Sequence, residues 1–238
     1  MNKTIGVFEL GRVPDALADS YADYASMIID WLRPALPEVD YQPIALVRDT
    51  PLPPVTACDA YVYSGSRHGV YDDLPWLGLL EGFIRQAAAC ARPQFGICFG
   101  HQIIAQALGG QAESFSGGWS CGVQLYELEL DNGPAQLPVY VMHQDQITAM
   151  PPAARNIGHS AQCAIGALDY EAPIRSIQFH PEFSAAYVSD LLRLRGGTAI
   201  PTAVAAAAAR SLDSAVDNTL IARWAAEFFR AHLELTGV

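Results

Sequence analysis

Positively charged residues are scarce in this sequence. The 238 residues include 14 lysines and arginines against 25 aspartates and glutamates, which gives a formal net charge of −11. Nucleic acids and anionic membrane surfaces attract clusters of basic residues, and the few basic residues here are scattered along the chain. The sequence therefore argues against nucleic-acid and membrane partners.

Long hydrophobic runs and paired cysteines are also missing. No segment approaches the roughly 20 apolar residues that cross a membrane, and the apolar opening is too brief for the core of a signal peptide. Five cysteines stand at irregular spacing without a CxxC pair, which argues against a zinc site and a redox dithiol. We expect a cytoplasmic protein with mostly buried, reduced cysteines and with neither a metal nor a cofactor.

The sequence does contain a regular alternation of element types. With 51% apolar residues, the chain can bury the core of one large domain. Up to about residue 110, short β-type runs alternate with helical patterns, whereas strand patterns, some of them antiparallel, dominate residues 119–180. We predict a three-layer α/β fold, in which an open mixed, mostly parallel sheet carries helices on both faces. Residues 1–238 are expected to form one domain, with a helical section at 185–238.

One cysteine lies where a strand pattern changes into a helical pattern. In "RPQFGICFGHQ", Cys98 stands between Gly96 and Gly100, and helical spacing begins directly afterwards. This form is typical of a nucleophile elbow, in which flanking glycines avoid collisions with neighbouring elements. The amide dipoles at a helix N-terminus also favour a thiolate. A buried structural cysteine on a glycine-rich turn is the alternative that the residues leave open.

A nucleophilic thiol requires a base, and six histidines are available. His101 follows Cys98 too closely to reach it. His180, in "SIQFHPEFS", ends an apolar strand, and Glu182 projects from the same face in extended geometry. Glu182 is therefore placed to orient the imidazole of His180. A solvated turn at the strand end remains the alternative.

Taken together, these motifs resemble a known family. "FGICFGHQIIAQALGG" with "IQFHPEF" resembles the glutaminase domain of the class I glutamine amidotransferases, whose triad is a Cys in GxCxGHQ and a His and a Glu in an HPE segment. "YVYSGSRHGVYDDLPWL" resembles the glycine turn that contributes to the oxyanion hole. The resemblance covers roughly residues 5–184 and looks strongest toward stand-alone proteins related to the glutaminase part of GMP synthase. It implies a flavodoxin-like arrangement.

The resemblance implies hydrolysis of a γ-carboxamide without a cofactor. Cys98 would attack the side-chain carbonyl, His180 would pass the proton to the leaving ammonia or amine, and Glu182 would orient His180. Water would then release glutamate from the thioester. The backbone N–H groups of Gly65 and Phe99 would stabilise the oxyanion.

Further positions are carried over with departures from the family pattern. Gln102 matches the family glutamine that contacts the substrate. The segment "MHQD" resembles a Ser-His-Gly-Asp segment whose backbone helps to hold the substrate, so His143 and Asp145 match whereas Gln144 replaces a glycine. Gly65 is the one glycine where many relatives have Gly-Gly-Pro. A bulkier residue at 144 leaves open a substrate other than free glutamine.

Three functions remain open from the sequence. The chain acts alone on glutamine or a γ-glutamyl compound, or it is the glutaminase subunit of a synthetase partner, or it is a non-catalytic module on the same fold. No GxxxxGK[ST] loop for ATP is present, so the chain itself lacks a recognisable synthetase. Two segments have two readings each: "LRLRGGTAIPTA" is a docking loop or a surface connection, and "FSGGWSCGV" is a pocket wall or a plain hairpin.

Overall fold

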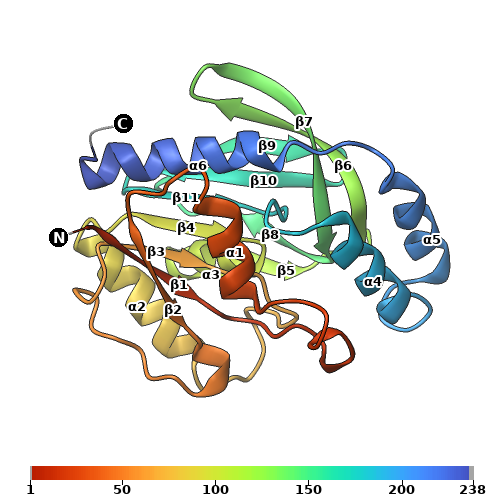
Figure 1. Ribbon diagram of the computed structural model, residues 1–238, viewed down its shortest axis with the longest axis horizontal. Helices are drawn as coiled ribbons and strands as arrows, with labels where there is room; N and C mark the ends of the chain where they lie inside the picture. The colour runs from red at the N-terminus through yellow and green to blue at the C-terminus, as the bar shows by residue number, and fades with distance from the viewer. Residues whose placement is uncertain (1, 236–238) are drawn as a thin grey trace.

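A computed structural model describes residues 2–235 and contains a nine-stranded main sheet in that range. The strand order is β2-β1-β3-β4-β11-β10-β9-β6-β7, in which the first five strands run parallel and the remaining pairs are antiparallel (Figure 1). A second sheet pairs β5 with β8. The strands are β1 (Thr4–Phe8), β2 (Asp40–Ile44), β3 (Ala60–Tyr63), β4 (Gln94–Ile97), β5 (Gln111–Ser114), β6 (Ser120–Leu130), β7 (Gly133–His143), β8 (Asp145–Ala149), β9 (Ala154–Ser160), β10 (Cys163–Tyr170) and β11 (Ile174–Ile177).

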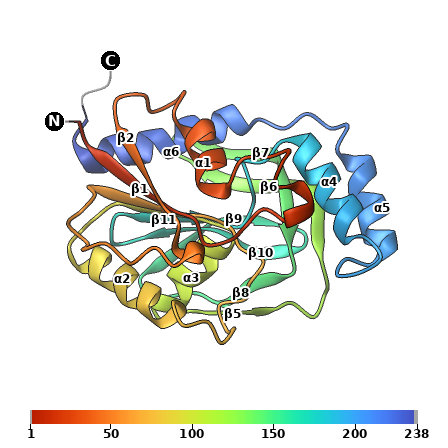
Figure 2. The ribbon, with the colours of Figure 1, turned by 60° about the horizontal axis from the view of Figure 1, so that its bottom comes forward.

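Helices cover both faces of the parallel strands, with α1 and α6 on one side and α2 and α3 on the other (Figure 2). Successive side chains of a strand point to opposite faces, so Ile5 and Val7 pack with α1 and α6, whereas Phe8, Tyr61 and Tyr63 pack with α2 and α3. The helices are α1 (Tyr24–Leu32), α2 (Leu77–Ala89), α3 (Phe99–Ala107), α4 (Ala185–Arg195), α5 (Thr202–Ser211) and α6 (Asn218–Leu233), with short 3-10 turns at Asp15–Leu17 and Leu46–Arg48.

The described part of the expected helical section consists of α4, α5 and α6, while residues 236–238 lie outside the described range. Helices α4 and α5 pack beside Tyr140 and Met142 of β7 in a third apolar cluster. The first residues of "LRLRGGTAIPTA" therefore complete α4, where Leu191 and Leu192 are buried, rather than forming a loop. Among residues 2–235, no helix is long and apolar enough to cross a membrane.

One helix starts later than the sequence pattern indicates. Asp73 and Pro75 fit a helix start, but α2 begins at Leu77. The preceding residues form turns instead, in which the Leu77 N–H donates to the Leu74 carbonyl (3.1 Å). This turn leads directly into α2, and the regular helix begins two residues after Pro75.

The parallel strands bring distant segments to one edge of the main sheet. The carboxyl ends of β1, β3, β4 and β11 lie at this edge, because these strands are neighbours and run in the same direction. In open α/β sheets, ligand sites form outside the carboxyl ends of the strands. Gly65 follows β3, Cys98 follows β4 and His180 follows β11, so these three residues meet at the same edge.

Candidate active site

Cys98 occupies a strained turn between β4 and α3. Its backbone angles are φ 53° and ψ −103°, a conformation that a residue with a side chain rarely adopts. Its N–H donates to the Ile177 carbonyl of β11 (2.8 Å), which ties the turn to the sheet. A Cβ atom at Gly96 would come within 2.6 Å of the Gly100 backbone, and one at Gly100 within 2.2 Å of the Tyr63 carbonyl oxygen. The turn therefore requires glycine on both sides of the cysteine.

His180 and Glu182 form a buried pair beside this turn. The Nδ1 of His180 lies 2.7 Å from Oε1 of Glu182, and the two side chains are 4% and 1% exposed. The backbone N–H of His180 donates to the Tyr140 carbonyl (2.8 Å), and the imidazole stacks on the Phe183 ring at 4.1 Å with an interplanar angle of 4°. A hydrogen bond, a backbone contact and a stacked ring thus fix the orientation of the imidazole.

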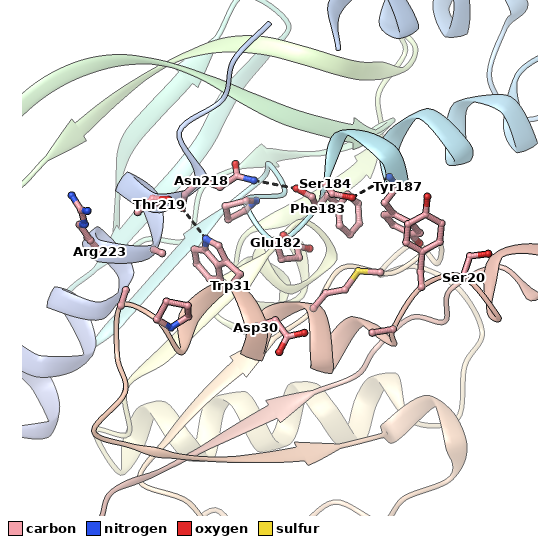
Figure 3. Close-up of a pocket in the computed structure, with 17 residues that line it drawn as sticks. Ser20, Asp30, Trp31, Glu182, Phe183, Ser184, Tyr187, Asn218, Thr219 and Arg223 are labelled. Atoms are coloured by element: carbon pink, nitrogen blue, oxygen red, sulfur yellow. Dashed lines mark hydrogen bonds between the residues drawn. The ribbon is translucent and has the colours of Figure 1, made fainter. Parts of the chain in front are cut away.

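Residues of α1 and α6 support the chain segment after His180 through hydrogen bonds (Figure 3). Asn218, at the start of α6, donates from Nδ2 to the Phe183 carbonyl (3.1 Å), and Trp31 of α1 donates from Nε1 to the Asn218 carbonyl (3.0 Å). These residues and Glu182 line a cavity of about 720 Å³ that does not include Cys98. The helices on this face therefore support the position of Glu182 from the side away from the thiol.

Charge interactions decide the protonation of His180. Burial by itself lowers the pKa of its imidazole, because the cation loses hydration. The negative charges of Glu182 and Cys98, with the 2.7 Å hydrogen bond to Glu182, outweigh burial and raise the pKa to about 10. The nearby His143 behaves in the opposite way, since burial and the charge of His180 lower its pKa to about 3. At neutral pH the site therefore holds one imidazolium and one neutral imidazole.

Gly65 allows the turn after β3 to pack closely against His180 and Cys98. A Cβ atom at Gly65 would lie 2.7 Å from Cε1 of His180 and 3.7 Å from Cβ of Cys98. The Ser64 hydroxyl shapes the turn, because it accepts from the Leu10 N–H and donates to the Gly65 carbonyl (both 2.9 Å). The Gly65 N–H has no protein acceptor among the described residues, and neither has the N–H of Phe99, the first residue of α3. Both amides are thus available as donors near the thiol.

A pair of buried amide side chains links α3 to the thiol. Gln102 is 3% exposed and donates from Nε2 to the Asp145 carbonyl (2.8 Å) and to Oε1 of Gln178 (3.1 Å). Gln178 in turn donates from Nε2 to Sγ of Cys98 (3.5 Å). The sequence reasoning missed Gln178, although it stands two residues before His180 and so shares a face of the extended segment. This hydrogen bond makes Gln178 a neighbour of the sulfur.

The segment between β7 and β8 provides the next part of the site. His143 is buried, with Nδ1 3.2 Å from the Asp145 carbonyl oxygen. The Asp145 carboxylate accepts from the Tyr71 hydroxyl (2.9 Å), a second contact that the sequence did not reveal because Tyr71 lies 74 residues away. The Gln144 carbonyl accepts from the Phe115 N–H (3.3 Å), which joins this segment to the turn after β5. The side chain of Gln144 is partly exposed.

A cavity of about 260 Å³ opens over the sulfur and collects several of the residues selected from the sequence. Cys98, Gln102, His143, Gln144 and Asp145 line it together. Trp119 lines it as well, which agrees with the pocket-wall reading of "FSGGWSCGV"; residues 115–118 form a turn that leads into β6. Among residues 2–235, no group of three or more His, Cys, Asp or Glu side chains is arranged to bind a metal ion.

Comparison with known protein sequences supports one family. A sequence profile described as "Glutamine amidotransferase class-I" matches residues 16–189. Gamma-glutamyl peptidase 3 of Arabidopsis thaliana is 28% identical over 137 residues, which cover 53% of this chain and 55% of that protein. A subunit of the glutamine-hydrolyzing GMP synthase of Thermococcus kodakarensis is 36% identical over 98 residues, covering 38% and 50%. The chain thus spans about half the length of these curated relatives.

Solved structures share the architecture over almost the whole chain. A glutamine amidotransferase from Methylobacillus flagellatus matches with a TM-score of 0.76 at 23% identity, covering 98% of this chain and 94% of the other. One from Thermotoga maritima matches with a TM-score of 0.74 at 18% identity, covering 98% and 99%. These similarities confirm the three-layer α/β fold predicted from the sequence.

Proposed function

Because the chain belongs to the class I glutamine amidotransferase family, we propose that it hydrolyses the γ-carboxamide of glutamine or of a related γ-glutamyl compound through a thioester on Cys98. The family match over residues 16–189 confirms the resemblance found in the motifs. One observation carries the proposal: a strained, glycine-flanked cysteine lies beside a buried His180–Glu182 pair with a 2.7 Å contact. A nucleophile, a base and an orienting carboxylate are the minimum set for this chemistry.

In the proposed reaction, the sulfur of Cys98 attacks the γ-carbonyl carbon and the carbonyl oxygen becomes an oxyanion. The N–H groups of Gly65 and Phe99 donate to this oxyanion, which is why their lack of a protein acceptor matters. Collapse of the tetrahedral intermediate breaks the carbon–nitrogen bond, and the imidazolium of His180 protonates the leaving nitrogen. His180 then accepts a proton from water, and the water oxygen attacks the thioester carbon. The carbon–sulfur bond breaks, which releases glutamate and restores the thiolate.

The glutamyl end of the substrate is proposed to occupy the 260 Å³ cavity. Gln102 and Asp145 are joined by the 2.8 Å hydrogen bond, so α3 and the β7–β8 segment form one wall. The carboxylate of Asp145 is suited to a substrate ammonium group. His143 holds the backbone of Asp145 in place through its contact with the Asp145 carbonyl. Gln144, which also lines the cavity, occupies the position where the family pattern has glycine and is proposed to influence the choice of substrate.

A second candidate is a glutaminase subunit that supplies ammonia to a synthetase. The similarity to a GMP synthase subunit favours it, and the chain contains no P-loop sequence of its own. The similarity to gamma-glutamyl peptidases favours an enzyme that acts alone. We place the independent hydrolase first, because Gln144 departs from the glutaminase pattern in the substrate cavity.

Glutamate release by the purified chain tests both candidates. The substrates are glutamine and a panel of γ-glutamyl amides and peptides, with Cys98→Ala as the blank. An independent hydrolase gives robust turnover that the blank lacks. Weak turnover that rises when a synthetase is added identifies a glutaminase that depends on a partner, and binding without Cys98-dependent turnover identifies a non-catalytic module.

Glu182→Gln tests the role of the orienting carboxylate. Because the charge of Glu182 helps to raise the pKa of His180 to about 10, its removal lowers that pKa. The imidazolium is then lost at lower pH, so the alkaline fall of kcat/KM moves down from the region of about pH 10. At neutral pH the rate should fall by roughly 10²- to 10⁴-fold, less than for loss of the nucleophile. Rate profiles over pH measure both effects, and an unshifted alkaline limb would contradict this role.

A further inference from the structure

Three arginines surround a second cavity next to the proposed catalytic cavity. Arg12, Arg67 and Arg195 line a hollow of about 580 Å³, which we name the arginine cavity. None of the three forms an ion pair or donates a side-chain hydrogen bond within residues 2–235. Arg12 and Arg67 are exposed and Arg195 is partly exposed, so three positive charges without an ion pair gather at one hollow of a chain whose net charge is −11.

The arginine cavity and the cavity over Cys98 share part of their walls. Four residues line both cavities: Arg67, His68, Trp119 and Arg195. Arg12 lines only the arginine cavity, which Gly11 and Arg12 approach from the end of β1. A single 260 Å³ cavity is small for an extended ligand, whereas the two together reach the usual size of small-molecule sites.

The proposed glutamyl contacts lie on one side of this arrangement. Gln102, His143, Gln144 and Asp145 line the cavity over the sulfur and are absent from the walls of the arginine cavity. If the glutamyl end of a substrate contacts these residues, its leaving amine faces the residues that line both cavities. Arg67 and Arg195 are among those residues.

The acidic residues near the arginine cavity are too few to neutralise its three arginines. Asp15 is the acidic residue among its lining residues, against three arginines. On the catalytic side, Asp72 already accepts from the Gly69 N–H and contacts His68, and Asp145 accepts from Tyr71. An anion, and a carboxylate in particular, matches the forked donors of arginine.

We propose that the arginine cavity binds a carboxylate carried by the leaving amine, so that the preferred substrates are γ-glutamyl peptides with a free C-terminus. This inference rests on the proposed function and specifies its substrate class. Water adds across the γ-amide, the carbon–nitrogen bond breaks, and glutamate and an amino acid or peptide leave. No oxidant, reductant or further reactant is involved.

The test compares γ-glutamylalanine with its C-terminal amide, which differ in the charge of the leaving amine. The wild-type chain should show a kcat/KM at least about tenfold higher for the free acid, as expected for a charge-assisted contact. Arg12→Gln should lower this ratio, and Arg12→Gln combined with Arg195→Gln should bring it close to one. The matched control is Arg210→Gln, on the exposed surface of α5, which should keep the wild-type ratio. A wild-type ratio near one, or a high ratio that Arg12→Gln leaves unchanged, would overturn the inference.

A binding measurement separates this inference from the proposed reaction. Calorimetric titration of Cys98→Ala with the same two compounds should show at least about tenfold tighter binding of the free acid, and Arg12→Gln in that background should reduce the difference. If wild-type chain hydrolyses neither compound while the binding preference holds, the proposed reaction fails and the anion site stands. If the wild-type chain hydrolyses both compounds equally well and Cys98→Ala binds them equally well, the anion site fails and the reaction stands.

Discussion

Cys98→Ser should lower the rate of glutamate release by at least about 10³-fold. The serine hydroxyl is a far weaker nucleophile than a thiolate, and it removes the negative charge that helps to hold His180 as an imidazolium. The side chain is nearly isosteric, so the strained turn between Gly96 and Gly100 should persist. Glutamate release and the mass of the glutamyl-enzyme after rapid quenching measure the effect, and the serine variant should carry no thioester.

Cys90 offers a matched control for this substitution. It is an exposed free cysteine directly after α2 and before β4, whereas Cys98 follows β4 and is buried. Cys90→Ser should retain the wild-type rate, and both variants should unfold at about the wild-type denaturant midpoint. Full activity in a correctly folded Cys98→Ser protein would remove Cys98 from the proposed mechanism.

Several features of the site could be predicted because they depend on local geometry. Gly96 and Gly100 flank Cys98 in sequence, and the collisions that they avoid arise within the strand-turn-helix unit and its neighbouring strand. The contact between His180 and Glu182 follows from two residues on one face of an extended segment. Cys98 and His180 are 82 positions apart in the sequence. They meet because β4 and β11 are neighbouring parallel strands whose carboxyl ends lie side by side.

Other features depend on contacts that no local pattern contains. Tyr71 reaches Asp145 from 74 residues away, and Arg195 enters the site only because α4 extends to that residue before packing against β7. The segment "NIGHSAQCAIGAL" forms two strands, β9 and β10, although no glycine or proline marks the turn at 161–162. The Ser160 hydroxyl supports that turn by accepting from the Cys163 N–H (3.1 Å), which is a side-chain contact without a strong sequence signal.

Gly100→Ala should destabilise the protein by roughly 1–3 kcal/mol or more in the free energy of unfolding. The new methyl group would lie 2.2 Å from the carbonyl oxygen of Tyr63 and 2.8 Å from its carbonyl carbon. These atoms belong to β3, which is paired on one side with β1 and on the other with β4, so the strand cannot move aside. The start of α3 must shift instead, and denaturant unfolding measures the resulting loss.

The same shift should reduce activity in the molecules that remain folded. The Gly100 N–H donates to the Ser64 carbonyl (3.1 Å), so displacement of α3 separates the Cys98 turn from the Gly65 turn. Gly82→Ala is the matched control, because a Cβ there meets no atom within 4 Å and alanine is the better helix former in α2. That control should gain roughly 0.5–1 kcal/mol of stability. Equal stability of the Gly100→Ala and wild-type proteins would mean that α3 can withdraw from β3 without cost, and the glycine after the nucleophile would then have no steric explanation.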